Sequence, residues 1–122
     1  MNAPSTKAWE LARNEARALL IERAGQGNFI TYSELANRIQ SMQLEAHDPR
    51  LARLLGEIST EEDKAGRGML SVIVVHKHGD CKPGRGFFDL ARELGRDASD
   101  EDKLFSEELK HVFATWKSGS RA

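Results

Sequence analysis

The chain has 122 residues and a formal net charge of −1, so it fits a single domain of ordinary size and excludes a strongly basic nucleic-acid-binding protein. Its only cysteine, Cys81, excludes an internal disulfide framework and favours a reducing, cytoplasmic location. Because no run of about 18 apolar residues occurs, we expect no membrane partner.

The first predicted helix begins after Ser5 or Thr6, either of which can cap it, and ends near Ala24, before a glycine-rich turn. Apolar side chains recur along it at helical spacing, at Trp9, Ala12, Ala16, Leu19 and Leu20. This pattern predicts an amphipathic scaffold helix.

Two short helices joined by a polar connection are predicted over about residues 31–60. Thr31 precedes Glu34 by three residues, the spacing of a capping box. Asp48 followed by Pro49 is a strong start for the second helix, because aspartate caps it and proline suits its first position. The pattern therefore predicts a helix-turn-helix.

A strand followed by a turn is predicted next, over about residues 69–88. Residues 69–78 are rich in β-branched side chains, and the following stretch to Gly86 contains several glycines and a proline. A second short strand around Gly86–Phe88 would complete a β-hairpin wing. The whole chain is then a single α+β domain, a mostly helical winged helix-turn-helix with additional N- and C-terminal helices.

Two C-terminal helices are predicted over about residues 88–117, the first ending at Gly95 and the second capped by Ser99 or Asp100. The last helix has a wide apolar face formed by Leu104, Phe105, Leu109, Val112, Phe113 and Trp116. This face is expected to pack in the core, and the alternative is that it holds a second copy of the chain or a protein partner.

The middle of the chain resembles the DNA-binding half of alkylguanine-DNA alkyltransferases and of the related alkyltransferase-like proteins. Those families show the pattern G-x-V-x-T-Y-G-x-I-A, then R-A-V-G-x-A, then P-C-H-R-V-V, then a glycine-bearing wing. The corresponding segments here are Gly27–Ala36, Arg53–Ile58, Leu70–Val75 and Gly79. The resemblance covers about half of the chain and implies a winged helix that binds duplex DNA.

The same comparison argues against alkyl transfer. Where the family has its methyl-accepting cysteine and a histidine, this chain has Ser71 and Val72. Alkyl transfer needs a thiolate activated by a neighbouring base, and this pair supplies neither. We therefore expect no catalytic residues, and without a reactive cysteine the sequence gives no reason to assume base flipping. The resemblance implies that Tyr32 lies near a phosphate and that Arg53 enters the duplex.

The charge distribution supports a local DNA-binding surface. Between Gly66 and Gly86 there are four cations and one anion, Asp80, whereas acidic residues outnumber basic ones from Phe87 onward. A few cations on a wing can supply the phosphate contacts that dominate non-specific binding. The candidate DNA-binding residues are Tyr32, Asn37, Arg38, Arg50, Arg53, Arg67, Lys77, Lys82 and Arg85.

Metal binding is the weakest of the alternatives. His76, His78, Asp80 and Cys81 are close in sequence and include metal-ligating types, but no second cluster with ligand spacing accompanies them. We expect no metal and no cofactor. The sequence therefore favours a non-catalytic protein that binds duplex DNA, and the competing hypothesis is a protein-interaction module whose apolar C-terminal helix docks a partner.

Overall fold

The protein is represented by a computed structural model that describes residues 6–77 and 82–117, and this part of the chain is mostly helical. It contains a short two-stranded sheet, so the class is α+β, as predicted. The elements in chain order are α1 (Thr6–Gly25), β1 (Ile30–Thr31), α2 (Tyr32–Arg38), α3 (Pro49–Lys64), the 3-10 turn η1 (Leu70–Ile73), β2 (Val74–Val75), α4 (Arg85–Glu93) and α5 (Glu101–Trp116).

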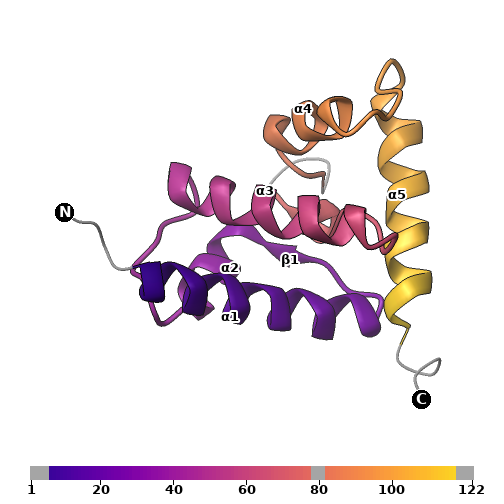
Figure 1. Cartoon of the computed structure of the whole chain (residues 1–122). Helices are drawn as coiled ribbons and strands as arrows, with labels where there is room; N and C mark the ends of the chain where they lie inside the picture. The colour runs from indigo at the N-terminus through magenta and orange to yellow at the C-terminus, as the bar shows by residue number, and fades with distance from the viewer. Residues whose placement is uncertain (1–5, 78–81, 118–122) are drawn as a thin grey trace.

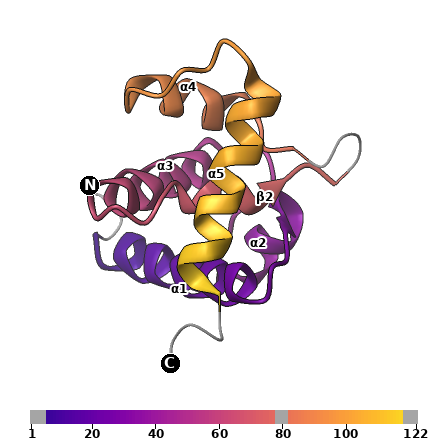
Figure 2. The same cartoon turned by 90° about the vertical axis from the view of Figure 1, so that its right-hand side faces the viewer.

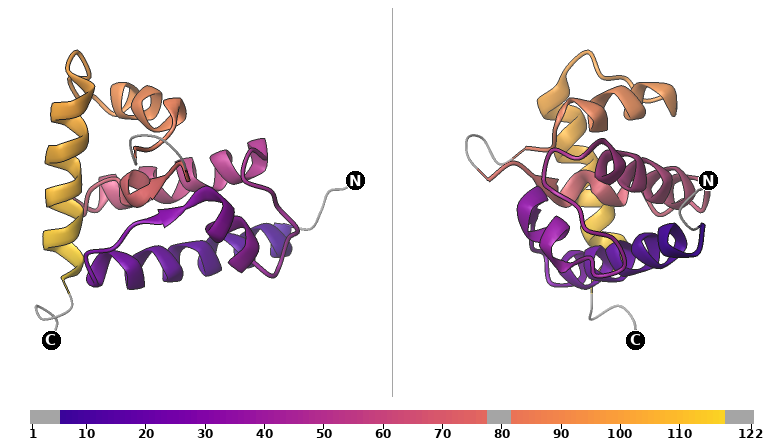
Figure 3. Two further views of the ribbon diagram at one scale, coloured as in Figure 1. Left: turned by 180° about the vertical axis from the view of Figure 1, so that it is seen from behind. Right: turned by 90° about the vertical axis from the view of Figure 1, so that its left-hand side faces the viewer.

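Helices α1 and α3 lie side by side, and α5 crosses one end of both (Figure 1). Viewed from that end, α5 passes in front of α1 and α3, and α4 lies beyond α3 on the side away from α1 (Figure 2). Seen from the side opposite to Figure 1, β1 lies between α1 and α3 (Figure 3). The core lies between α1, α3, α5 and η1. Each of the three helices contacts η1, and α1 also contacts α3 and α5. None of the helices in the described parts is long and apolar enough to cross a lipid bilayer.

Helices at both predicted positions are present as α2 and α3, joined by residues 39–48, and both predicted N-caps are confirmed. The Thr31 hydroxyl accepts a hydrogen bond from the Glu34 backbone N–H at 3.1 Å, and an Asp48 carboxylate oxygen accepts one from the Arg50 N–H at 2.9 Å. In a capping box the Glu34 carboxylate would reach back to the backbone of the capping residue. Here it pairs with Arg23 of α1. That ion pair ties the start of α2 to α1.

The prediction of a long strand over residues 69–78 is wrong for the described part of that segment. Only Val74–Val75 is a strand, and it pairs in parallel with Ile30–Thr31. The preceding residues are buried, and two of their backbone N–H groups donate to side chains instead of to a neighbouring strand. Met69 donates to the Glu108 carboxylate at 2.7 Å, and Ser71 donates to the Ser59 hydroxyl at 3.0 Å. These partners allow a 3-10 turn where the composition favoured a strand.

The predicted second strand around Gly86–Phe88 is also wrong, because these residues lie in the first turn of α4. Phe87, Phe88 and Ala91 are buried at helical spacing, so helix formation places all three apolar side chains in the core. The described residues therefore contain no antiparallel hairpin, and the wing of the predicted winged helix is not present in them. The predicted tip, residues 78–81, lies outside the described residues.

The C-terminal helix is present as predicted. The Asp100 carboxylate caps α5 by accepting a hydrogen bond from the Lys103 N–H at 3.1 Å. Leu104 and Val112 are buried, and the other large apolar side chains of this face are half-buried against the core. Most of the apolar face of α5 is therefore used for packing within the chain.

Candidate functional site

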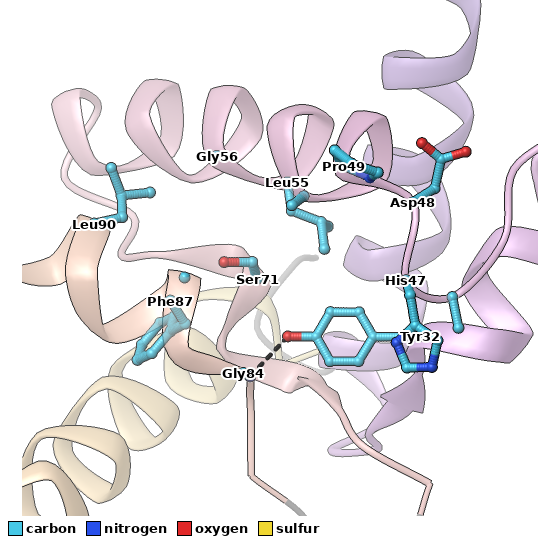
Figure 4. Close-up of a pocket in the computed structure, with 13 residues that line it drawn as sticks. Tyr32, His47, Asp48, Pro49, Leu55, Gly56, Ser71, Gly84, Phe87 and Leu90 are labelled. Carbon is cyan, nitrogen blue, oxygen red and sulfur yellow. Dashed lines mark hydrogen bonds between the residues drawn. The ribbon is translucent and has the colours of Figure 1, made fainter.

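A cavity of about 290 Å³ lies beneath the first half of α3, between that helix and the start of α4. Figure 4 shows Leu55 projecting from α3 toward it, with Ser71, Tyr32 and Phe87 on the other sides. The volume is at the lower end of the range for small-ligand sites, about 300 to 1,000 Å³. Its lining residues are Tyr32, Ala46, His47, Asp48, Pro49, Ala52, Leu55, Gly56, Ser71, Gly84, Gly86, Phe87 and Leu90.

The cavity has mainly apolar walls and a hydroxyl in its buried part. Leu55 and Phe87 are buried, and both contribute to its walls. Ser71 is also buried, and its hydroxyl accepts a hydrogen bond from the Ser59 hydroxyl at 2.7 Å. A serine hydroxyl can donate one hydrogen bond and accept two, so the Ser71 hydroxyl retains hydrogen-bonding capacity for a ligand. The cavity thus suits a small, largely apolar group that carries a hydrogen-bonding atom.

Tyr32 forms one side of the cavity, and both its hydroxyl and its ring are fixed by contacts. Its hydroxyl accepts a hydrogen bond from the Gly84 N–H at 2.8 Å, and burial raises the pKa of this phenol, so it stays neutral. Its ring lies against the imidazole of His76, with the centroids 5.1 Å apart. A Cβ atom on Gly84 would lie 3.3 Å from the Tyr32 hydroxyl and 3.2 Å from His76 Nε2. A glycine at position 84 therefore allows the backbone to approach both rings.

Three of the predicted DNA-binding residues lie around the end of α2 and the start of α3. Asn37 and Arg50 line one hollow of about 580 Å³. Arg50 is also bonded to Asp48, at 2.7 Å between Nη2 and Oδ2. Arg38 lies at the end of α2, and its guanidinium is 3.8 Å from the Glu34 carboxylate. Ion pairs at the protein surface contribute little to stability, so these arginines can exchange a carboxylate for a phosphate at little cost.

Arg53 is more exposed than Arg50 on the same helix. Its side chain is 77% exposed and lies 3.7 Å from the Glu57 carboxylate, with the guanidinium over the ring of Trp9. Residues three and four apart in a helix are neighbours on its surface. Arg53 is therefore next to Pro49 and Gly56, both of which line the cavity.

The other predicted cations do not gather on one wing. Lys82 and Arg85 form ion pairs with Asp102 and Glu101 at the start of α5. Arg67 follows the other end of α3 and binds the buried carboxylate of Glu62 at 2.6 Å. Lys77 is exposed and lines a hollow that also includes Tyr32. The structure thus brings Tyr32 close to Lys77 and Asn37 close to Arg50, and it places Arg67 elsewhere.

The cavity and its lining residue His47 were not predicted from the sequence, and His76 was considered there only as a metal ligand. The only available signal was indirect: in the resemblance described above, Ser71 stands at the position of the reactive cysteine of alkyltransferases, and such a position should face a ligand. His78, Asp80 and Cys81, considered above as metal ligands, lie outside the described residues. Within residues 6–77 and 82–117, no group of three or more His, Cys, Asp or Glu side chains is arranged to hold a metal ion.

Comparisons of the chain with protein-family models, with curated proteins and with solved structures find no significant match.

Proposed function

We propose that the protein binds duplex DNA through α2 and the first half of α3, and that the cavity beneath α3 receives an extruded base. The cavity is the observation on which this proposal depends. It lies directly beside the exposed surface of α3, the second helix of the predicted helix-turn-helix, and the second helix is the one that such a motif presents to a groove. The resemblance to alkyltransferase-like proteins points to the same class of ligand.

An aromatic base matches the cavity chemically. Its flat faces would contact apolar walls such as Leu55 and Phe87, and a ring carbonyl or ring nitrogen would accept the hydrogen of the Ser71 hydroxyl. Arg53 is placed beside the cavity-lining face of α3, where its long side chain can enter the duplex and fill the space that the base leaves. The cavity thus supplies a reason for base extrusion that the sequence lacks.

Ser71 is suited to binding a base and not to reacting with it. A serine becomes a nucleophile when an adjacent base removes its proton. The side chain bonded to the Ser71 hydroxyl is Ser59, another hydroxyl that cannot act as that base. We therefore propose recognition of the base and no transfer to the protein.

Arg53→Ala is expected to weaken duplex binding about tenfold and to reduce the slope of affinity against salt, because the side chain that fills the space of the extruded base is lost together with its positive charge. Fluorescence anisotropy with a labelled duplex at two salt concentrations measures both quantities. Arg92→Ala is the matched control, since Arg92 is an exposed arginine on α4 whose partners are Asp89 and Glu101. Equal affinity and equal salt slope in Arg53→Ala and the wild type would remove α3 from the interface.

Gly86→Leu tests the cavity itself. Gly86 lines the cavity, and no atom lies within 4 Å of the position that a Cβ would take there, so a side chain can be added at this position without a clash at its Cβ. A mismatched base is cheaper to extrude than a paired one, so the wild type should prefer a mismatched duplex. We expect Gly86→Leu to lose that preference and to keep its affinity for the fully paired duplex.

The matched control for this experiment is Ala18→Leu, which adds the same side chain at an exposed position of α1 away from the cavity. It should keep the preference for the mismatched duplex. If Gly86→Leu also keeps it, the base does not enter the cavity.

A further inference from the structure

The Arg53 guanidinium, which the proposed function needs beside the cavity, lies instead on α1. Its central carbon is 5.6 Å from the ring centre of Trp9, a residue of α1, and its Nε is 3.7 Å from the Glu57 carboxylate. Neither of these two residues lines the cavity. The neighbours of Arg53 on the other side of α3 are Pro49 and Gly56, and both of them do. The side chain therefore rests on the side of α3 that faces α1, away from the cavity.

Contacts between Glu57 and α1 create this resting position. One carboxylate oxygen of Glu57 accepts hydrogen bonds from the Trp9 indole N–H at 2.9 Å and from the Arg13 guanidinium at 3.0 Å. Its other oxygen is the one that faces Arg53. Trp9 and Arg13 are four residues apart on α1, so they lie on one face of the helix and both reach the same carboxylate. Trp9, Arg13 and Glu57 thus form a resting site, in which a fixed negative charge and a ring face hold one guanidinium.

The resting site holds Arg53 loosely enough to release it. The Arg53 side chain is 77% exposed, and its distance of 3.7 Å from Glu57 is longer than a hydrogen bond. A cation over an exposed aromatic ring and an ion pair at the surface are both weak interactions in water. Contacts with a duplex can therefore replace them.

We infer that Trp9 and Glu57 keep Arg53 on α1 in the free protein and release it when α3 meets a duplex. The inference rests on the proposed function and deepens it, because it names what regulates the side chain that fills the space of the extruded base. The guanidinium has to leave the Trp9 ring before it can reach that space, so the resting site competes with duplex binding. Trp9 and Glu57 are positioning residues, since they act through Arg53.

Glu57→Gln tests this competition. The amide oxygen of glutamine can still accept hydrogen bonds from α1, but the negative charge that faces Arg53 is lost. We expect the variant to bind a labelled mismatched duplex about threefold more tightly than the wild type, the size of effect that a weak surface contact allows. Fluorescence anisotropy with the full-length protein measures this change.

Glu61→Gln is the matched control, because Glu61 is an exposed carboxylate two turns beyond Arg53 on α3 and reports the general repulsion between acidic side chains and phosphates. The double variant Arg53→Ala/Glu57→Gln separates that repulsion from the contact with Arg53. Compared with Arg53→Ala, it should gain no more affinity than Glu61→Gln gains over the wild type. An equal gain from Glu57→Gln with and without Arg53 would overturn the inference.

The release itself can be observed by NMR. Nuclear Overhauser contacts between the Arg53 side chain and the Trp9 ring should be present in the free protein and lost with saturating duplex. Arg17 and Trp116 are the control pair, with the guanidinium carbon 5.8 Å from the ring centre, and should keep their contacts. Contacts of Arg53 with Trp9 that persist on the duplex would overturn the inference and leave the proposed function standing. A wild type that binds no duplex would overturn the proposed function, and the release of Arg53 with it.

Discussion

Glu108→Ala is expected to lower the free energy of unfolding by about 3 kcal/mol, a larger effect than any single contact at the proposed DNA surface should have. The Glu108 carboxylate is buried and accepts three hydrogen bonds. The Met69 backbone N–H donates at 2.7 Å, and two nitrogens of Arg96 donate at 2.7 and 3.1 Å. Arg96 also binds Asp63 of α3 at 2.6 Å. One side chain of α5 thus anchors the start of η1 and the segment that follows α4.

Truncation would leave the Met69 N–H buried without its acceptor and would leave Arg96 with one carboxylate instead of two. Thermal unfolding followed by circular dichroism should show a fall in Tm of roughly 10 to 20 °C for a domain of this size. Glu107→Ala is the matched control, since Glu107 is the exposed neighbour on the same helix. A Tm for Glu108→Ala within about 2 °C of the Glu107→Ala value would refute the anchoring role.

The helix starts could be predicted because their causes are local. Thr31, Asp48 and Asp100 each accept a backbone hydrogen bond within three residues, so the sequence alone contains both partners. The strand over residues 69–78 could not be corrected in this way. Its alternative, the η1 turn, depends on Ser59 and Glu108, which accept hydrogen bonds from the backbone N–H groups of Ser71 and Met69 across 12 and 39 residues of sequence.

The cavity was unpredictable for a similar reason. Its walls come from the start of α2, the first half of α3, η1 and the start of α4, and only the fold brings these together. The positions of the cations in the fold could not be predicted from the composition of the segment either. Arg67, Lys82 and Arg85 are basic residues of one sequence segment, but in the fold each meets a carboxylate from α3 or α5. The candidate surface is therefore smaller than the sequence suggested and centres on α3 and Tyr32.

Glu62→Gln should lower the free energy of unfolding by about 2 to 3 kcal/mol, because the Glu62 carboxylate is a buried anion that two arginines share. Arg17 of α1 donates to it at 2.8 Å, and Arg67 donates at 2.6 and 3.2 Å. Both guanidinium groups also lie over the ring of Trp116, each 5.8 Å from its centre. The Glu62 carboxylate, by positioning these two arginines, therefore also helps to hold the end of α5. A glutamine keeps the shape of the side chain but loses the charge, and only its oxygen can accept.

The dependence of stability on pH gives this prediction a second readout. Burial alone would raise the pKa of Glu62, but the hydrogen bonds and charges of Arg67 and Arg17 outweigh burial and lower that pKa below its usual value. A carboxyl with a lowered pKa in the folded state stabilises the protein above its unfolded pKa, and this stabilisation is lost as the pH falls through the folded pKa. The wild type should therefore lose stability on acidification by more than Glu62→Gln does, and urea unfolding at neutral and acidic pH measures the difference. Glu61→Gln, an exposed neighbour on α3, should behave like the wild type at both. If Glu62→Gln and the wild type lose stability in parallel as the pH falls, the ionised carboxylate of Glu62 does not hold α1, α3 and α5 together.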